Sequence, residues 1–388
     1  MGNPLPSGGN APLSIRITID ALPLLFRSAG VKNYLYYWIQ HLQQEPGADV
    51  RLFPLPVADA TLDHRRTLAG RVPTFFRLGL FFWMNRLPAG FSQPWFPATD
   101  IFHSTRILHP PRRAKLTSTI HDLTCWILPD THLPANVAFE QRFAQLIWKR
   151  ADGLIAVSES SRNDAVRLLG IPAEKIQVIY PGIPESYFSI GPSDVAQVRA
   201  ELGRERPYLL YVGTVEPRKN VDLLLDAYGE LAGSIASEFD LVIVGSQGWA
   251  SQATMRRLKS PPPRVRYLGY VPESSLPALF AGATAFVYPS LYEGFGFPVA
   301  QAMAAGVPVI TSGVSSLPEI TAGAALLIDP RSRVELRDAM QSLLTSATLR
   351  ARLSDLGRIQ ARKFSWPAAA AQSLQFFSRV AAGSCYCE

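Results

Sequence analysis

The chain is 47% hydrophobic and 18% charged, a composition that excludes an intrinsically disordered protein. Its 388 residues are too many for one ordinary core, so we expect two domains. The formal net charge of +7 falls within residues 51–150, which hold 13 Lys and Arg against 6 Asp and Glu. This basic segment indicates an anionic partner, such as a phospholipid head group or a lipid-linked phosphate, or else a plain solvated surface; no nucleic-acid-binding signature accompanies it, and we expect no nucleic acid.

The first half of the chain alternates short apolar strands with helices. A helix is expected at 31–42, and a second from a cap at Ser160 or Ser161 to Leu169. The aromatic stretch Val72–Leu87 carries arginines and is shorter than the ~18 apolar residues of a membrane-spanning helix. It is therefore either a helix lying at a membrane interface or a buried core helix. The expected strands are 13–20, 100–105, 115–122, 153–158 and 176–183.

A stretch rich in proline, glycine and serine at 181–194 has the composition of a linker, and the alternation restarts after it. The expected strands of the second half are 207–215, 239–246, 264–271, 283–290, 307–312 and 324–329. This pattern predicts an α/β protein of two doubly wound, Rossmann-like domains. Ligands of such sheets bind at the C-terminal ends of the strands, so we expect the site in a cleft between the two sheets.

The stretch YEGFGFPVAQAMAAGVPVI follows an expected strand and contains the start of a helix near Phe297. Gly294 and Gly296 precede that helix, where free backbone N–H groups and the helix dipole favour an anion. Glu293 is suited to accept hydrogen bonds from sugar hydroxyls, and Gln301 lies about one turn into the helix, within reach of the same ligand. The alternative is a glycine-rich turn before a helix with a polar face.

The stretch GTVEPRKNVDLLLDAY also joins a strand to a helix. Arg218 and Lys219 stand at the end of the strand, and their side chains suit phosphate oxygens. A pyrophosphate between this pair and the amides after Glu293 is the favoured interpretation, and an exposed basic turn is the alternative.

Histidines end two strands of the first half. His121, in STIHDLTCW, is placed to contact a reacting group opposite the phosphate site, although a structural histidine in the core fits the same pattern. His103, in DIFHST, has a similar position. In RSAGVKNYLYYW, Gly30 permits close approach of a ligand at the start of the first helix.

Several motifs are absent from the sequence. We find no D-x-D pair, no His/Cys cluster with metal spacing, no serine-hydrolase or P-loop motif and no dinucleotide fingerprint, and we expect neither metal nor cofactor. Cys125 and the pair Cys385 and Cys387 form no disulfide framework, which indicates a reducing compartment. No signal peptide is evident, so a cytoplasmic protein is expected, with peripheral contact at the inner face of the membrane as an option.

Together these stretches resemble the retaining glycosyltransferases of family 4, which have the GT-B fold. The resemblance runs from about Ile15 to Arg379 and includes EGFGFPVAQAMAAGVPVI, GTVEPRKN, STIHDLT, ADGLIAVSESSRNDAVRLLGI and FSWPAAAAQSLQFF. It implies an acceptor-binding domain at 1–187, a nucleotide-sugar-binding domain at 188–365, and a final helix, 366–388, that returns to the first domain. The first half is most similar to mannosyltransferases of surface polysaccharide assembly.

The resemblance also implies roles for particular residues. The catalytic set is His121, Glu293, Arg218 and Lys219. The donor-binding set is Gly213, Arg218, Lys219, Tyr270, Val271, Glu293, Gly294, Phe295, Gly296 and Gln301. The acceptor-binding set is Gly30, Lys32 and His103. The implied partners are a nucleotide diphosphate sugar and a glycan or lipid-linked acceptor, and the implied reaction is metal-independent hexosyl transfer.

Two positions depart from the family pattern. Gln301 stands where a second glutamate is usual, and the first loop has Gly30-Val31-Lys32 where G-x-G is common. A neutral amide bonds ribose less strongly than a carboxylate, so we expect weaker donor binding with activity retained. The alternatives are a catalytically silent nucleotide-sugar-binding subunit, or an epimerase or phosphorylase on the same fold.

Overall fold

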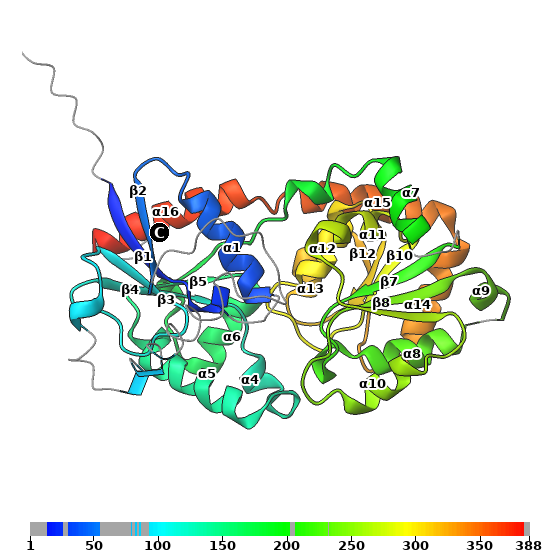
Figure 1. Ribbon diagram of the computed structural model, residues 1–388, viewed down its shortest axis with the longest axis horizontal. Coiled ribbons are helices and arrows are strands. Elements are labelled where there is room, and N and C mark those ends of the chain that lie inside the picture. The colour runs from blue at the N-terminus through cyan, green and yellow to red at the C-terminus, as the bar shows by residue number, and fades with distance from the viewer. Residues whose placement is uncertain are drawn as a thin grey trace, which may run out of the picture.

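The computed structural model describes residues 14–25, 30–54, 79, 82–83, 85–86, 93–201, 206–231 and 233–383 (Figure 1). Two parallel sheets lie side by side along the long axis of the molecule, each at the centre of one domain. The predicted α/β fold of two doubly wound Rossmann-like domains is thereby confirmed. Arg27, most of Val72–Leu87 and the Cys385/Cys387 tail lie outside the described residues.

The first sheet has six strands in the order β2-β1-β3-β4-β5-β6, all parallel. Its strands are β1 (Ile15–Asp20), β2 (Ala48–Phe53), β3 (Ile101–Ser104), β4 (Lys115–Ile120), β5 (Gly153–Ala156) and β6 (Ile176–Val178). The helices around it are α1 (Gly30–Leu42), α4 (Thr124–Ile127), α5 (Pro134–Leu146) and α6 (Glu159–Leu169). Strand β2 was not among the expected strands, and the expected strand at 176–183 is shorter than predicted.

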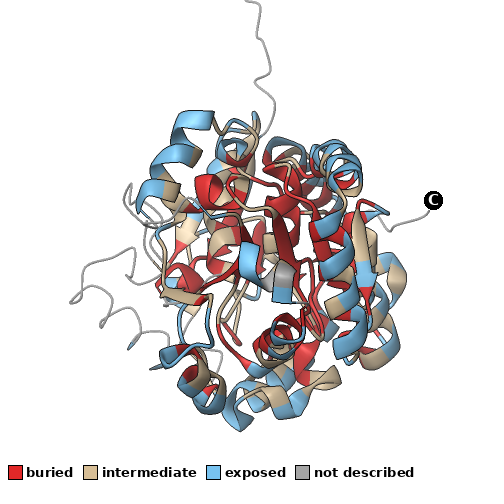
Figure 2. Ribbon diagram, turned by 90° about the vertical axis from the view of Figure 1, so that its right-hand side faces the viewer, coloured by how far each residue is buried: buried red, intermediate tan, exposed pale blue. Residues whose placement is uncertain are grey.

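The second sheet has six parallel strands in the order β12-β11-β10-β7-β8-β9. Its strands are β7 (Tyr208–Val212), β8 (Asp240–Val244), β9 (Val265–Gly269), β10 (Ala285–Tyr288), β11 (Val309–Ser312) and β12 (Ala325–Ile328). Its helices are α7 (Pro192–Glu201), α8 (Val221–Gly229), α9 (Gly233–Glu238), α10 (Gln252–Lys259), α11 (Leu276–Ala281), α12 (Phe297–Ala304), α13 (Leu317–Thr321), α14 (Arg333–Thr345) and α15 (Ala347–Ala361). Figure 2 shows buried strands within a shell of helices whose outer faces are exposed, as two-sided coverage of a parallel sheet requires.

The last helix, α16 (Trp366–Ala381), runs from the second domain back across the first (Figure 1). Its Ser373 accepts a hydrogen bond from the indole N–H of Trp38 on α1 at 2.9 Å. A Cβ on Gly153 would lie 2.8 Å from Val380, so the glycine permits close packing of α16 on β5. Near the start of this helix the two inter-domain segments meet, where Ile183 N donates to Phe364 O at 3.0 Å.

Helix α6 begins earlier than its predicted caps. Ser158 is the N-cap, and its hydroxyl accepts a hydrogen bond from the backbone N–H of Ser161 at 3.0 Å. Ser160 and Ser161 are residues of the helix itself, so the cap prediction is wrong by two or three positions. A cap needs an extended backbone before the first turn, and Ser158 has one, with φ −161° and ψ 161°.

Candidate active site

The two motifs of the second half lie together because their strands are neighbours. Strand β7 pairs with β10, so the segments after their C-terminal ends emerge at the same edge of the sheet. Leu291 N donates to Arg218 O at 2.9 Å and joins the two segments directly. The structure therefore brings Arg218 and Lys219 next to Glu293, as the strand order of a doubly wound sheet requires.

Glu293 is the centre of a buried ionic cluster. Its Oε1 accepts hydrogen bonds from Lys219 Nζ at 2.5 Å, Ser290 Oγ at 2.7 Å and Tyr288 OH at 3.0 Å. Its Oε2 pairs with the Arg218 guanidinium at 3.0 Å. Oε1 is thus fully engaged within the protein, while Oε2 faces a single partner and retains acceptor capacity for a ligand.

A second carboxylate balances the cluster. Arg218 also pairs with Glu216 at 2.9 Å and donates to Tyr292 O at 2.6 Å. Two cations therefore face two carboxylates, all in buried or nearly buried side chains. Glu216 was not predicted as a site residue; it stands within the quoted motif, but only the fold reveals that it turns toward Arg218.

The electrostatics of the cluster keep Glu293 charged. Burial opposes ionisation, but the charges of Arg218 and Lys219 outweigh it and lower the pKa of Glu293 to about 2. Burial lowers the pKa of Lys219, and the charge of Arg218 lowers it further. Arg218 has a raised pKa because Glu293 and Glu216 outweigh its own burial. Arg218 and Glu293 are therefore held in their charged forms inside the protein.

The segment after Glu293 leads into helix α12. Gly296 is the residue before the helix and has φ +89°, a left-handed conformation that favours glycine. Gly294, Phe295 and Gly296 are buried, and their amides donate no hydrogen bond to any residue that the structure describes. Unpaired N–H groups before a helix N-terminus favour an anion, and the predicted contact of these three with the donor stays a prediction.

Gln301 lies on α12 with 5% of its surface exposed. No hydrogen bond of its side-chain amide is found within the described part of the chain, and its predicted contact with the ribose stays a prediction. Gly213 directly follows β7, and Tyr270 and Val271 follow β9 at the same sheet edge. Their predicted contacts with the donor stay predictions.

His121 lies at the end of β4, opposite the Gly294 segment. A Cβ on Gly294 would lie 1.7 Å from the carbonyl oxygen of His121, so this glycine permits the two domains to touch here. The imidazole stands edge-on to the Tyr34 ring at 4.9 Å. Burial lowers the pKa of His121 to about 4, against the opposing charge of Asp122, so the ring is neutral at neutral pH.

The structure contradicts the predicted acceptor contact of His103. Its side chain is fully buried, and its two ring nitrogens bond the hydroxyls of Thr117 at 3.1 Å and Thr119 at 3.0 Å. The ring also packs on Trp38 and Phe377, and burial lowers the pKa of His103 to about 3. It is a core residue without access to an acceptor.

The other two predicted acceptor residues differ in exposure. Gly30 is the exposed first residue of α1, whereas Lys32 has no exposed surface. A direct contact between Lys32 and an acceptor does not fit this burial, while the role of Gly30 stays a prediction.

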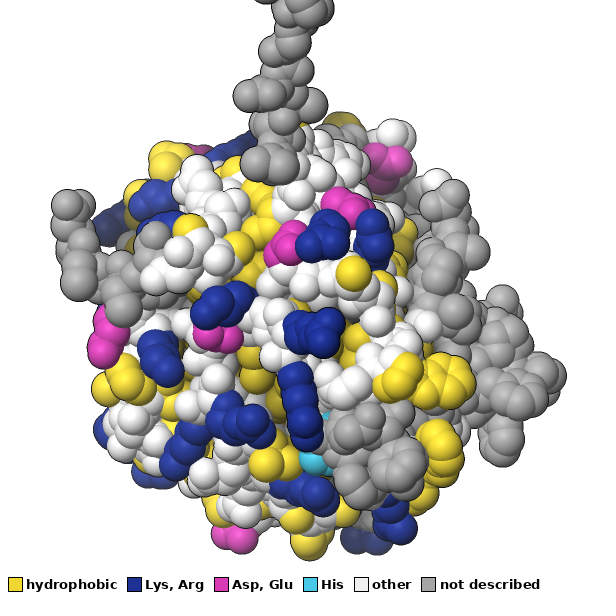
Figure 3. Space-filling view, turned by 90° about the vertical axis from the view of Figure 1, so that its left-hand side faces the viewer, with side chains coloured by type: hydrophobic (Ala, Val, Ile, Leu, Met, Phe, Trp, Pro, Cys, Tyr) yellow, Lys and Arg dark blue, Asp and Glu magenta, His cyan; other side chains and the backbone are white. Residues whose placement is uncertain are grey.

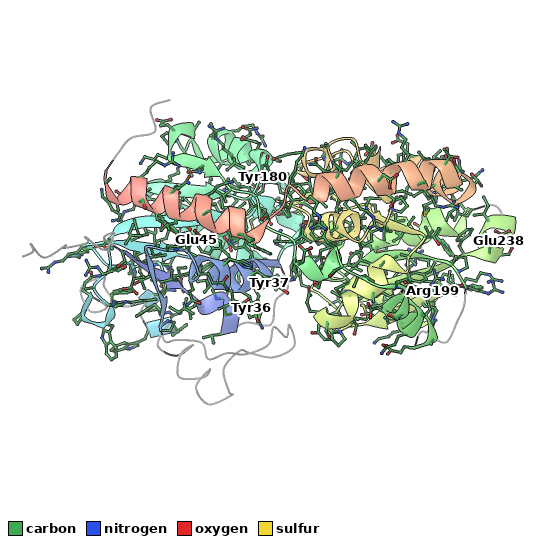
Figure 4. The ribbon with its side chains drawn as sticks, turned by 90° about the horizontal axis from the view of Figure 1, so that it is seen from above. Tyr36, Tyr37, Glu45, Tyr180, Arg199 and Glu238 are labelled. Carbon is green, nitrogen blue, oxygen red and sulfur yellow. The ribbon has the colours of Figure 1, made fainter. Side chains whose placement is uncertain are left out.

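Glu319 fastens the two domains together. From α13 its carboxylate accepts the backbone N–H groups of Glu159 at 2.8 Å and Ser160 at 3.1 Å, at the N-terminus of α6. The hydroxyl of Tyr180, located where the domains meet in Figure 4, donates to the same carboxylate at 2.7 Å. Sequence reasoning missed Glu319, because no local pattern marks a carboxylate that caps a helix of another domain.

Two more contacts cross the domain boundary. Ser158 Oγ donates to Gly294 O at 2.6 Å, and Tyr292 OH donates to Asp164 Oδ2 at 2.6 Å. With the Glu319 contact, they hold the Gly294 segment against the C-terminal ends of β4 and β5. The C-terminal ends of the strands of both sheets therefore face each other, which is the arrangement expected for a site shared by the two domains.

A pocket of about 670 Å³ lies elsewhere, over one face of α5 in the first domain. It is lined by His109, Trp126, Ala138, Gln141, Arg142, Gln145 and Leu146, none of which was predicted as a site residue.

None of the helices in the described part of the chain combines the length and apolar character needed to cross a bilayer.

Comparisons with known proteins agree with this fold. The family model Glycosyl transferases group 1 matches residues 194–360, and Glycosyltransferase Family 4 matches residues 28–187. The O-antigen chain mannosyltransferase B of Escherichia coli is 32% identical over 280 residues, which cover 71% of this chain and 74% of the relative.

Solved structures share the fold at low sequence identity. A sucrose-phosphate synthase of Thermosynechococcus elongatus has a TM-score of 0.73 at 20% identity, over 95% of this chain and all of the other. HepE of Anabaena, solved in complex with UDP-glucose, has a TM-score of 0.64 at 17% identity, over 93% of this chain and 98% of its own.

Proposed function

Because the chain belongs to the group 1 and family 4 glycosyltransferases and is a hexosyltransferase with the GT-B fold, we propose that it is a retaining, metal-independent enzyme of surface polysaccharide assembly. It moves a hexose, mannose or glucose, from a nucleotide diphosphate sugar to a glycan or lipid-linked acceptor. The mannosyltransferase relative supports mannose, and the UDP-glucose complex of HepE supports a nucleotide sugar. Residues 1–187 bind the acceptor, residues 188–365 bind the donor, and 366–388 form the returning segment.

The observation that carries this proposal is the buried cluster of Arg218, Lys219 and Glu293 beside the unpaired amides that precede α12. Two cations and a helix N-terminus suit the two phosphates of a donor, and the free acceptor capacity of Glu293 suits a sugar hydroxyl. The backbone carbonyl of His121, in the other domain, lies against Gly294, the residue that follows Glu293.

In the proposed mechanism, the bond between the anomeric carbon and the phosphate oxygen breaks while the bond to the acceptor oxygen forms on the same face of the sugar. Arg218, Lys219 and the amides before α12 stabilise the charge that develops on the leaving diphosphate. The proton of the acceptor hydroxyl passes to the departing phosphate oxygen. The contacts between the domains exclude water and align the reactants.

The test is hexose transfer from GDP-mannose and UDP-glucose to a synthetic lipid-linked acceptor, with the double variant Arg218→Ala/Lys219→Ala. We expect the double variant to lose at least ~10²-fold in kcat/KM, because both leaving-group cations are removed. Transfer at the wild-type rate would show that this assignment is wrong. An α-linked product from an α-linked donor, and a rate unchanged by EDTA, are the expected signs of retention and metal independence.

The same assay separates the alternatives. Donor binding without transfer or hydrolysis would identify a silent binding subunit, for which the neutral Gln301 was the reason. Formation of a C2-epimeric nucleotide sugar would identify an epimerase, and phosphate-dependent cleavage of a glycan would identify a phosphorylase. Each of these outcomes contradicts the proposed transfer.

We include an anionic membrane surface among the proposed partners. Lys and Arg side chains gather on the end of the molecule that the first domain forms (Figure 3). Arg112 and Arg113 are exposed just before β4, while Lys115 is tied to Asp152 at 3.1 Å. Each surface cation contributes about 1 kcal/mol to binding of anionic lipid. Neutralising Arg112 and Arg113 should weaken sedimentation with phosphatidylglycerol vesicles about tenfold or more, and unchanged sedimentation would remove the membrane from the proposal.

A further inference from the structure

A further contact between the domains lies near Arg218 and involves an aromatic pair. The indole N–H of Trp249, between β8 and α10, donates to the backbone oxygen of Thr131 at 2.5 Å. The same indole stacks on the imidazole of His132, with ring centroids 5.7 Å apart and planes 28° apart. Because Trp249 uses both its ring face and its N–H, it fixes the position of His132 against the second domain.

His132 lies near charged groups of the candidate site. Its imidazole is within electrostatic range of Asp122, Arg218 and Glu216. Burial lowers the pKa of His132, so the ring is neutral before an anion binds, with the charge of Asp122 raising that pKa and the charge of Arg218 lowering it. Neither the sequence motifs nor the cluster around Glu293 accounts for a histidine at this place.

The ring nitrogen Nε2 of His132 is buried and bonds no group of the described chain. Buried polar atoms in proteins almost always have a partner, since leaving one unpaired costs free energy. His103 is the contrast within this chain, because both of its buried nitrogens bond threonine hydroxyls. Other buried side-chain atoms of the described chain, such as Thr18 Oγ1 and Trp366 Nε1, are also unpaired, but Nε2 of His132 belongs to a ring within electrostatic range of Arg218, which makes it a candidate ligand contact.

We propose that His132 contacts the donor, with its Nε2 hydrogen-bonded to the diphosphate from the side of the first domain while Arg218 binds it from the second. Trp249 positions the imidazole for this contact. An anion is the favoured partner because it is attracted to Arg218 and converts the neutral imidazole into a charged donor. The inference rests on the proposed function, since it assigns a further contact to the same donor site.

Two variants separate ligand binding from packing. His132→Phe keeps an aromatic ring on Trp249 but has no nitrogen, whereas His132→Gln loses the ring but places an amide N–H close to the position of Nε2. The probes are GDP and UDP, with guanosine and uridine as controls that lack the phosphates, and affinities are measured by titration calorimetry. Nucleoside binding by each variant also shows that its donor domain is folded.

We expect His132→Phe to weaken the preferred nucleoside diphosphate about tenfold or more and to leave its nucleoside unchanged, while His132→Gln stays within about threefold of wild type. Diphosphate affinity unchanged in His132→Phe would overturn the inference and reduce His132 to a packing residue, with the proposed function intact. If the wild-type protein binds neither diphosphate, both the proposed function and this inference fail.

Discussion

Replacing Gly294 with alanine is expected to push the two domains apart. A Cβ on Gly294 would lie 1.7 Å from the carbonyl oxygen of His121 and 2.8 Å from its carbonyl carbon. Because real Cβ contacts essentially never fall under 3.0 Å, the separation must grow by at least the difference of 3.0 and 1.7, which is 1.3 Å. The obstructing atoms belong to the backbone, so no side-chain rotation relieves the overlap.

This displacement would disturb catalysis more than folding. It would stretch the hydrogen bond from Ser158 Oγ to Gly294 O, now 2.6 Å, beyond a normal length. Misplacement of reacting groups by about 1 Å can cost ~10²-fold in rate. We therefore expect kcat/KM to fall by about 10²-fold, while the thermal midpoint changes little because neither sheet core is altered.

The assay combines steady-state kinetics, thermal unfolding and small-angle X-ray scattering, in which the radius of gyration should rise as the domains separate. Gly229→Ala is the matched control, since a Cβ there meets nothing within 4 Å. A Gly294→Ala enzyme with wild-type kcat/KM and an unchanged radius of gyration would refute the reasoning.

Three further substitutions test the cluster and the interface. Glu293→Gln should make the thermal midpoint less sensitive to acid. The pKa of Glu293 is about 2 against an ordinary 4.5, so the ionised side chain adds stability above about pH 4.5, and this stability is lost as the pH falls toward 2. Equal slopes of thermal midpoint against pH in the variant and the wild type would contradict this. Glu319→Ala removes the acceptor of three inter-domain hydrogen bonds and should lower kcat/KM at least tenfold. Glu319→Gln keeps one accepting oxygen but replaces the other with an NH2 group, so it should lose less activity than the alanine variant. Equal loss in both would show that the remaining acceptor contributes nothing. Gln301→Glu should tighten donor binding about fivefold if the side chain faces the ribose, as measured by calorimetry, and unchanged affinity would mean that it points elsewhere.

The sequence was most informative where one segment determines its own structure. The buried strands of both sheets were predicted because their apolar runs are bounded by turn residues. Strand β2 was missed because Asp49 and Arg51 interrupt its apolar residues and most of the strand is only partly buried, as suits the edge of the sheet. The glycines before α12 were found from sequence because a helix start after a strand is a local pattern.

Properties that depend on distant segments were not predictable. His103 was interpreted as a strand-end site residue, but α16, about 270 positions later, covers that face of the sheet with Phe377. The pairing of Arg218 with Glu293 rather than with solvent depends on the adjacency of β7 and β10. His132 and Glu319 lie in segments without a recognisable motif, and only the contact between the domains gives them a role.

The measurement that tests the central claim most directly is a thermal-shift panel of nucleotide sugars and free nucleotides on the wild-type protein. A donor present at 100 times its Kd stabilises the folded state by about 2.7 kcal/mol, which raises the midpoint by several degrees. We predict such a rise with a nucleotide diphosphate mannose or glucose, and its loss in the Arg218→Ala/Lys219→Ala variant. A wild-type midpoint that no nucleotide sugar moves would contradict the assignment of this cluster as a donor site.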